Sequence, residues 1–174
     1  MVNTIGYKRE ATSALYVPSD DDDFIESMGV GGAEMATVYG YPLPAMIACA
    51  CIESAFGRSK IYQLTGCPFN LQKPSSWKYP DCTVRWLQTI NKPDEKAKFS
   101  PFCVAEDLDD AARLWCEWIY FYPNGSAKKA IEAQVGQARQ FAAELWRVGF
   151  AASSKTATKK FADLIDSKNL MRFA

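Results

Sequence analysis

Glu53 is the single charged residue in an apolar stretch of the sequence. Residues 45–56 read Ala-Met-Ile-Ala-Cys-Ala-Cys-Ile-Glu-Ser-Ala-Phe. An ionised carboxylate is unfavourable in apolar surroundings, so its pKa should be raised, which suits a general acid. The structural alternative is an ion pair at the helix end, for instance with Arg58. The sequence therefore indicates acid catalysis by Glu53.

The chain contains no histidine, and this absence narrows the chemistry. Ser-His-Asp triads, Cys-His proteases and most catalytic zinc sites require an imidazole, so these classes are excluded. Carboxylate, lysine, tyrosine and thiol chemistry remain. Paired carboxylates are typical of glycoside hydrolysis, in which one acid protonates the leaving oxygen.

The six cysteines show no C-x-x-C spacing, so we expect no metal site, and no cofactor is indicated. Cys67, Cys82 and Cys103 lie in the loop-rich middle of the chain. They can form a disulfide outside the cytosol, with a connectivity that the sequence leaves open. Free thiols are the alternative.

The composition fits one globular domain, with 174 residues, 48% hydrophobic and 23% charged. Lys plus Arg equals Asp plus Glu at 20 each, so we expect no nucleic-acid partner. No apolar run is long enough to span a bilayer, and we expect no membrane insertion. Residues 1–10 lack the apolar core of a signal peptide.

The hydrophobic pattern predicts a mainly α (α+β) domain, a helical body with a small irregular or β lobe. We expect helices at residues 23–40, 45–56, 106–122, 126–148 and 156–166. Glycines at 29, 31 and 32 should weaken the first of them. The helical period disappears between residues 66 and 101, where residues 83–90 are predicted to form a strand. We divide the chain into a polar leader, 1–22, and a domain, 23–174.

Two blocks of the sequence resemble glycoside hydrolase family 73, the flagellar-type endo-β-N-acetylglucosaminidases. Residues 52–59, Ile-Glu-Ser-Ala-Phe-Gly-Arg-Ser, are similar to its Leu-Glu-Ser-(small)-(aromatic)-Gly-(basic)-Ser signature. Residues 67–71, Cys-Pro-Phe-Asn-Leu, resemble its Asn-Leu-Phe-Gly segment in altered order. The second block, residues 141–151, is similar to its Leu-x-x-Ala-Gly-Tyr-Ala pattern. The resemblance extends over residues 24–166. Two blocks at compatible spacing are more specific than either block alone.

The resemblance implies a lysozyme-like fold and hydrolysis of peptidoglycan. The bond cleaved would be the β-1,4 bond between N-acetylglucosamine and N-acetylmuramic acid, with Glu53 protonating the glycosidic oxygen. Family members often carry a second glutamate in the small lobe, but the matching position near Trp86 has no carboxylate. Asp94 and Glu95, with Asp81, are the nearby candidates for this second group.

The remaining site residues are predicted to bind the substrate. They are Ser54, Phe69, Asn70, Trp77, Tyr79 and Phe150. Phe150 stands where the family has a tyrosine, so a phenol hydroxyl of the relatives is absent. Trp77 and Tyr79 are selected because apolar sugar faces pack on aromatic rings, and Trp86 is a further candidate.

The lack of a signal peptide and of a wall-binding repeat suggests delivery by a dedicated machine. In this the sequence resembles the small glycoside hydrolase effectors that type VI secretion injects into competitors. This resemblance implies an antibacterial toxin, secreted without a signal peptide and acting in the periplasm of target cells. Its partners would be the peptidoglycan glycan strand, the secretion machinery and a cognate immunity protein. The alternatives are a muramidase or lytic transglycosylase of the same fold, and a non-catalytic cell-wall-binding module.

Overall fold

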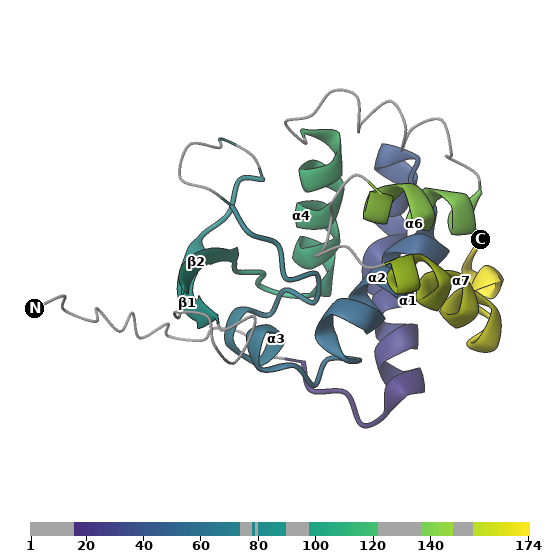
Figure 1. The fold of residues 1–174 in the computed structure, drawn as a ribbon, viewed down its shortest axis with the longest axis horizontal. Coiled ribbons are helices and arrows are strands. Elements are labelled where there is room, and N and C mark those ends of the chain that lie inside the picture. The colour runs from purple at the N-terminus through teal and green to yellow at the C-terminus, as the bar shows by residue number, and fades with distance from the viewer. Residues whose placement is uncertain (1–15, 74–77, 79, 90–97, 122–136, 148–154) are drawn as a thin grey trace, which may run out of the picture.

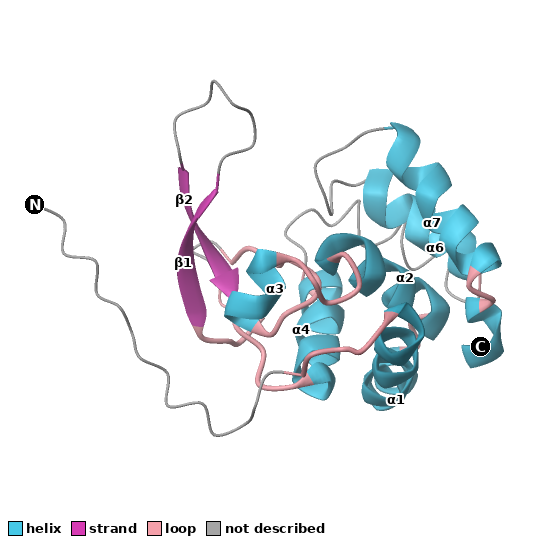
Figure 2. Ribbon diagram, turned by 90° about the horizontal axis from the view of Figure 1, so that it is seen from below, coloured by secondary structure: helices cyan, strands magenta, loops and turns pink. Residues whose placement is uncertain are grey.

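The computed structural model of the chain describes residues 16–73, 78, 80–89, 98–121, 137–147 and 155–174. A body of helices lies beside a small lobe that contains a β-hairpin and a short helix (Figures 1 and 2). In chain order the described elements are α1 (Asp21–Tyr39), α2 (Leu43–Ser54), α3 (Lys60–Thr65), β1 (Val84–Thr89), β2 (Lys98–Cys103), α4 (Leu108–Tyr120), α6 (Ala138–Arg147), α7 (Lys155–Ser167) and the 3-10 helix η1 (Leu170–Phe173). The predicted architecture of a helical body with a small β lobe is confirmed.

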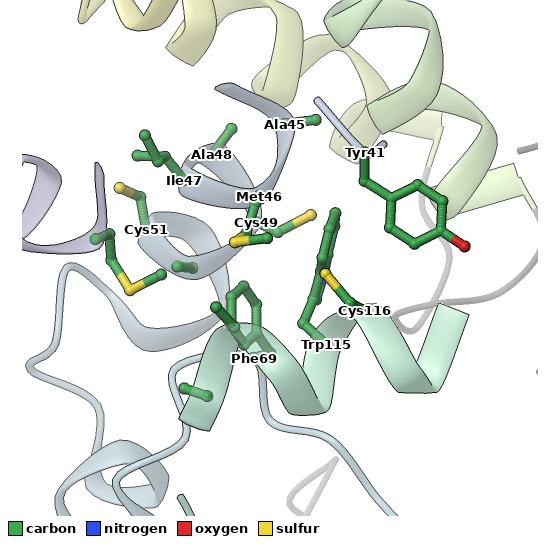
Figure 3. Close-up of a cluster of buried hydrophobic side chains, with 14 of the residues drawn as sticks. Tyr41, Ala45, Met46, Ile47, Ala48, Cys49, Cys51, Phe69, Trp115 and Cys116 are labelled. Atoms are coloured by element: carbon green, nitrogen blue, oxygen red, sulfur yellow. The ribbon is translucent and has the colours of Figure 1, made fainter. Parts of the chain in front are cut away.

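Helix α2 is the centre of the body. Every residue from 44 to 51 is buried, because α1, α6, α7 and η1 all pack against this helix. Figure 3 shows its Met46 and Cys49 on the side that faces Trp115. The prediction of a buried helix here is confirmed. The helix begins and ends two residues earlier than predicted, at Leu43 and Ser54.

Helix α1 runs without interruption through the glycines that were predicted to weaken it. The side chain of Asp20 caps the helix by accepting a hydrogen bond from the N–H of Asp23, at 2.9 Å. A Cβ atom on Gly31 would lie 2.9 Å from Leu108 at the start of α4, and one on Gly32 would lie 2.8 Å from Leu43. The glycines therefore allow α4 and α2 to approach the α1 backbone closely.

The small lobe consists of α3 and the antiparallel pair β1–β2. The register runs from Val84 opposite Cys103 to Thr89 opposite Lys98, so the predicted strand at residues 83–90 is confirmed. The outer edge of β2 pairs with the loop that follows α3. The N–H of Cys103 donates to the carbonyl of Leu71 at 2.8 Å, and the N–H of Lys73 donates to the carbonyl of Pro101 at 3.0 Å. Sequence periodicity did not reveal α3, which is only six residues long.

The last helices agree with the predicted pattern where they are described. Helix α6 occupies the end of the predicted helix 126–148, while residues 122–136 lie outside the described part of the chain. Helix α7 and η1 follow and pack on α2. None of the described helices combines the length and apolar character needed to cross a membrane.

The domain boundary at residue 22 stays a prediction, because residues 1–15 lie outside the described part. The segment just before α1 is attached to the body. The hydroxyl of Tyr62 donates to the carbonyl of Tyr16 at 2.9 Å, and Ser27 donates to the Tyr16 hydroxyl at 2.9 Å.

All six cysteines are free thiols in this structure. Cys82 and Cys103 nevertheless lie side by side, and the hydrogen bond between them lowers the pKa of the Cys82 thiol and raises that of Cys103. A disulfide among Cys67, Cys82 and Cys103 stays a prediction.

Candidate active site

Glu53 is the next-to-last residue of α2, where the buried helix reaches the surface. Its side chain is partly buried, whereas residues 44–51 before it are fully covered. The alternative role for this carboxylate, an ion pair with Arg58, does not occur in the structure. Arg58 pairs instead with Asp21, at 2.7 Å between Nη2 and Oδ1. Glu53 thus has no ion-pair partner among the described residues.

One side chain from another part of the fold reaches the carboxyl group of Glu53. The Nδ2 group of Asn70 donates to Oε2 of Glu53 at 3.1 Å and to the backbone carbonyl of Glu53 at 2.6 Å. That carbonyl lies in the last turn of α2, where carbonyl groups lack partners within the helix. Asn70 therefore caps the helix and contacts the candidate acid with the same nitrogen.

The surroundings of Glu53 favour the neutral acid. Burial raises the pKa of the Glu53 carboxyl, while the N–H of Asn70 acts in the opposite direction and lowers this pKa. Burial is the larger of the two effects. A carboxyl group that keeps its proton to a higher pH can donate it to a leaving oxygen.

The raised pKa makes the stability of the protein depend on pH in a way that Glu53→Gln should remove. Below the usual pKa of glutamate, Glu53 is protonated in both the folded and the unfolded protein, so its ionisation costs no folding stability. As pH rises from that value to the raised pKa, the unfolded chain ionises first, so the wild type loses stability relative to Glu53→Gln. Above the raised pKa, the difference in stability between the wild type and Glu53→Gln stays constant. Urea denaturation of both proteins between pH 4 and pH 8 measures this difference; parallel curves would contradict the raised pKa.

Ser54 shapes the turn that follows Glu53. It is fully buried, and its hydroxyl donates to the carbonyl of Ala50 at 2.6 Å and accepts from the N–H of Gly57 at 2.8 Å. The three residues 55–57 all have positive φ angles, of 51°, 55° and 76°. Ser54 was predicted to bind substrate, but the structure gives it an internal role in place of that contact. Its hydrogen bonds hold the turn and explain why α2 ends at Ser54.

The turn after Glu53 requires glycine at position 57. With φ at 76°, a Cβ atom on Gly57 would lie 2.9 Å from Pro18 and 3.0 Å from Phe24. Gly40 is a matched control, since its φ is 68° but no atom lies within 4 Å of its Cβ position. We expect Gly40→Ala to cost about 1–2 kcal/mol through φ alone. Gly57→Ala should cost at least about 1 kcal/mol more because of the contacts. Chemical denaturation compares the two; equal losses would contradict the crowding at Gly57.

Phe69 is part of the core. It is 2% exposed, and its ring lies 5.7 Å from that of Trp115 in α4. A buried ring does not offer a face to a sugar, so the predicted substrate contact of Phe69 is replaced by a packing role. Phe69 and Leu71, which is 3% exposed, anchor the loop on both sides of Asn70.

Several predicted site residues lie outside the described part of the chain. These are the second carboxylate candidates Asp94 and Glu95 and the substrate contacts Trp77, Tyr79 and Phe150. Asp81 is described and exposed, and its N–H donates to the carboxylate of Glu117 at 3.1 Å. Trp86 is 57% exposed on β1.

A hollow of about 480 Å³ lies away from Glu53. It is lined by Tyr16, Glu26, Ser27, Val30, Gly31, Tyr62, Gly66, Glu106, Asp107, Leu108 and Asp109. Neither Glu53 nor Asn70 borders it, so we do not expect it to hold the reacting bond. No group of three or more His, Cys, Asp or Glu side chains in the described residues is arranged to hold a metal ion.

Comparison with known proteins assigns the fold. No protein-family model and no curated protein matches the sequence. Among solved structures, the catalytic domain of the autolysin Auto from Listeria monocytogenes matches with a TM-score of 0.70 and 18% identity, covering 94% of this chain and 92% of that one. The glycoside hydrolase domain of FlgJ from Salmonella typhimurium matches with a TM-score of 0.64 and 20% identity, covering 88% and 91%. The chain has a lysozyme-like fold.

The lysozyme-like fold also occurs in a third similar structure, a type VI secretion system effector–immunity complex from Pseudomonas protegens. The TM-score is 0.59 and the identity 15%, covering 87% of this chain and 94% of that one. The predicted fold class is therefore confirmed, and so is the structural likeness to glycoside hydrolase domains that the two sequence blocks suggested.

Proposed function

We propose that this chain is a peptidoglycan hydrolase that cleaves the β-1,4 glycosidic bond with Glu53 as general acid. The observation that carries the proposal is the carboxyl group at the end of a buried helix, with a raised pKa and with no ion-pair partner among the described residues. Glycoside hydrolysis needs such a group, because the leaving sugar oxygen must be protonated as its bond to carbon breaks. The lysozyme-like fold, found in the autolysin and FlgJ domains, supports the same substrate class.

The finer proposal is an endo-β-N-acetylglucosaminidase, with Asp94 or Glu95 as the second carboxylate. Trp77, Tyr79 and Phe150 are proposed to contact the glycan. In an inverting enzyme the two carboxyl groups stand about 6.5–9.5 Å apart, and in a retaining enzyme about 5–5.5 Å. The stereochemistry of the product therefore tests which geometry the second group adopts.

Digestion of purified sacculi tests the bond that is cut. The released fragments are reduced with borohydride and analysed by mass spectrometry. Fragments that end in reduced N-acetylglucosamine would support a glucosaminidase. Ends at N-acetylmuramic acid or its anhydro form would instead identify a muramidase or lytic transglycosylase. Binding to sacculi without release of soluble fragments would leave the non-catalytic wall-binding module.

The biological role that we propose is an antibacterial toxin acting in the periplasm of target cells, with an immunity protein as partner. Its support is the structural likeness to the effector of the Pseudomonas protegens complex. Expression in a Gram-negative host tests it. The chain directed to the periplasm should lyse the cells, whereas the same chain kept in the cytoplasm should not. Growth without lysis in both cases would count against the toxin role.

A further inference from the structure

Asn70 uses its side chain in an unusual way. Its Nδ2 group makes two hydrogen bonds, both to Glu53, while its Oδ1 atom is buried and has no hydrogen-bond partner among the described residues. Buried polar atoms are generally hydrogen-bonded, and an exception calls for an explanation. A buried amide with a purely structural role would be expected to form hydrogen bonds through both its nitrogen and its oxygen. Here the nitrogen makes both hydrogen bonds, one to the backbone carbonyl of Glu53 and one to its carboxyl group.

The orientation of the amide follows from its partners. Glu53's backbone carbonyl can only accept a hydrogen bond, and it lies 2.6 Å from the Asn70 side chain. The atom facing it must therefore be the nitrogen, and a flipped amide would set two oxygens against each other. The same nitrogen lies 3.1 Å from Oε2, so Oε2 also faces a donor.

This donor distinguishes the two oxygens of the Glu53 carboxyl group. In a neutral carboxyl group the carbonyl-type oxygen is the better acceptor of an N–H group than the hydroxyl oxygen, so the Asn70 bond to Oε2 favours the form with the proton on Oε1. We propose that Asn70 is the positioning residue of the acid: its N–H occupies Oε2, so that Oε1 carries the proton delivered to the glycosidic oxygen. The inference rests on the proposed function of Glu53. The same N–H remains on Oε2 after the proton has left and stabilises the carboxylate that forms.

The fold holds Asn70 in place from both sides. Its backbone has a φ of 50°, a left-handed conformation that asparagine tolerates better than most residues. Phe69 before it packs on Trp115 in the core, and Leu71 after it accepts a hydrogen bond from the N–H of Cys103 in β2. The edge of the hairpin thus fixes the residue that orients the acid at the end of α2.

Few other groups near Glu53 affect the pKa of its carboxyl group. The described residues of α1, α6, α7 and η1, the elements packed on α2, contribute no charged side chain that shifts the pKa of Glu53. Its titratable neighbour is the buried thiol of Cys49, one turn earlier in α2, whose own pKa is raised by burial and then by Glu53. Burial and the Asn70 N–H are therefore the two influences that a test must separate.

The test compares Asn70→Gly and Asn70→Asp with wild type. Glycine keeps the left-handed backbone and removes the N–H, and aspartate keeps the shape but replaces the donor with a second carboxylate. Asn169→Gly is the matched control, because Asn169 is also left-handed, with φ at 48°, and is exposed beside η1. The pKa of Glu53 is measured by NMR titration of protein labelled with carbon-13 at the glutamate carboxyl groups. Glu53→Gln identifies the resonance, and no substrate is needed.

We expect the pKa of Glu53 to rise from wild type to Asn70→Gly and to rise again in Asn70→Asp, because a donor is lost and then a like charge is added. The basic limb of the pH–rate profile should move in the same order. On a soluble peptidoglycan oligosaccharide, kcat of Asn70→Gly should fall by about 10- to 100-fold through loss of orientation, with KM nearly unchanged. Asn169→Gly should behave as wild type.

The outcomes separate the two proposals. An unchanged pKa of Glu53 in Asn70→Gly would overturn the positioning role, and a raised KM alongside it would make Asn70 a substrate contact. The expected order of pKa values in a protein that cleaves no glycan would support the action of Asn70 on Glu53 and overturn the proposed function.

Discussion

Replacing Glu53 with glutamine is expected to lower the rate of glycan cleavage by about 10²- to 10⁴-fold, the usual contribution of a general acid. Glutamine has nearly the same shape and can still accept the hydrogen bond from the Asn70 N–H, but it has no proton to donate. The loss should therefore be one of chemistry and not of folding. The release of soluble fragments from sacculi, measured at matched protein concentrations, gives the ratio of rates.

A second Glu→Gln variant controls for the change of charge. Glu34 is exposed on α1, so Glu34→Gln should retain wild-type activity. The folded state of Glu53→Gln should be at least as stable as wild type near neutral pH, because the cost of ionising a partly buried carboxyl is removed. Full activity of Glu53→Gln would reject this residue as the acid and with it the proposed site.

Replacing Trp115 with alanine is expected to destabilise the protein by about 3–5 kcal/mol. Trp115 is fully buried in α4, where Figure 3 shows it together with Tyr41 and Phe69. Its ring lies 6.1 Å from that of Tyr41, 5.7 Å from that of Phe69 and 6.1 Å from that of Phe141. Its removal leaves a cavity between α4 and α2 and withdraws the surface on which Phe69 rests. Denaturation in guanidinium chloride measures the loss.

Trp86 provides the matched control for this substitution. It is 57% exposed on β1, so Trp86→Ala should change the free energy of unfolding by no more than about 0.5 kcal/mol. Below the unfolding transition, Trp115→Ala should also have reduced activity, because Asn70 directly follows Phe69 in the chain. A Trp115→Ala protein as stable as the Trp86→Ala protein would contradict the packing described for the core.

Local sequence patterns predicted the helices and the environment of the acid. An apolar run of twelve residues with one charge is long enough to favour a buried helix over a strand, and α2, with Glu53 near its end, has this form. The sequence pattern does not predict α3, since a helix of six residues has less than two turns over which to repeat a pattern. Helix propensity alone predicts a weak α1 at its glycines, whereas the close packing of α2 and α4 against Gly32 and Gly31 explains why the helix continues through them.

The lysozyme-like fold was implied by the resemblance of two sequence blocks to a known family. The hydrophobic pattern by itself determined the buried central helix and the identity of the candidate acid. These depend on residue type and spacing, which are local quantities. Only the tertiary structure decided how the acid is held. The sequence motif includes Ser54, but only the structure shows that its hydroxyl is hydrogen-bonded inside the turn. Asn70 contacts Glu53 across 17 residues of sequence. That contact depends on a left-handed residue in a loop and on the pairing of β2 with the same loop, and no periodic pattern records either.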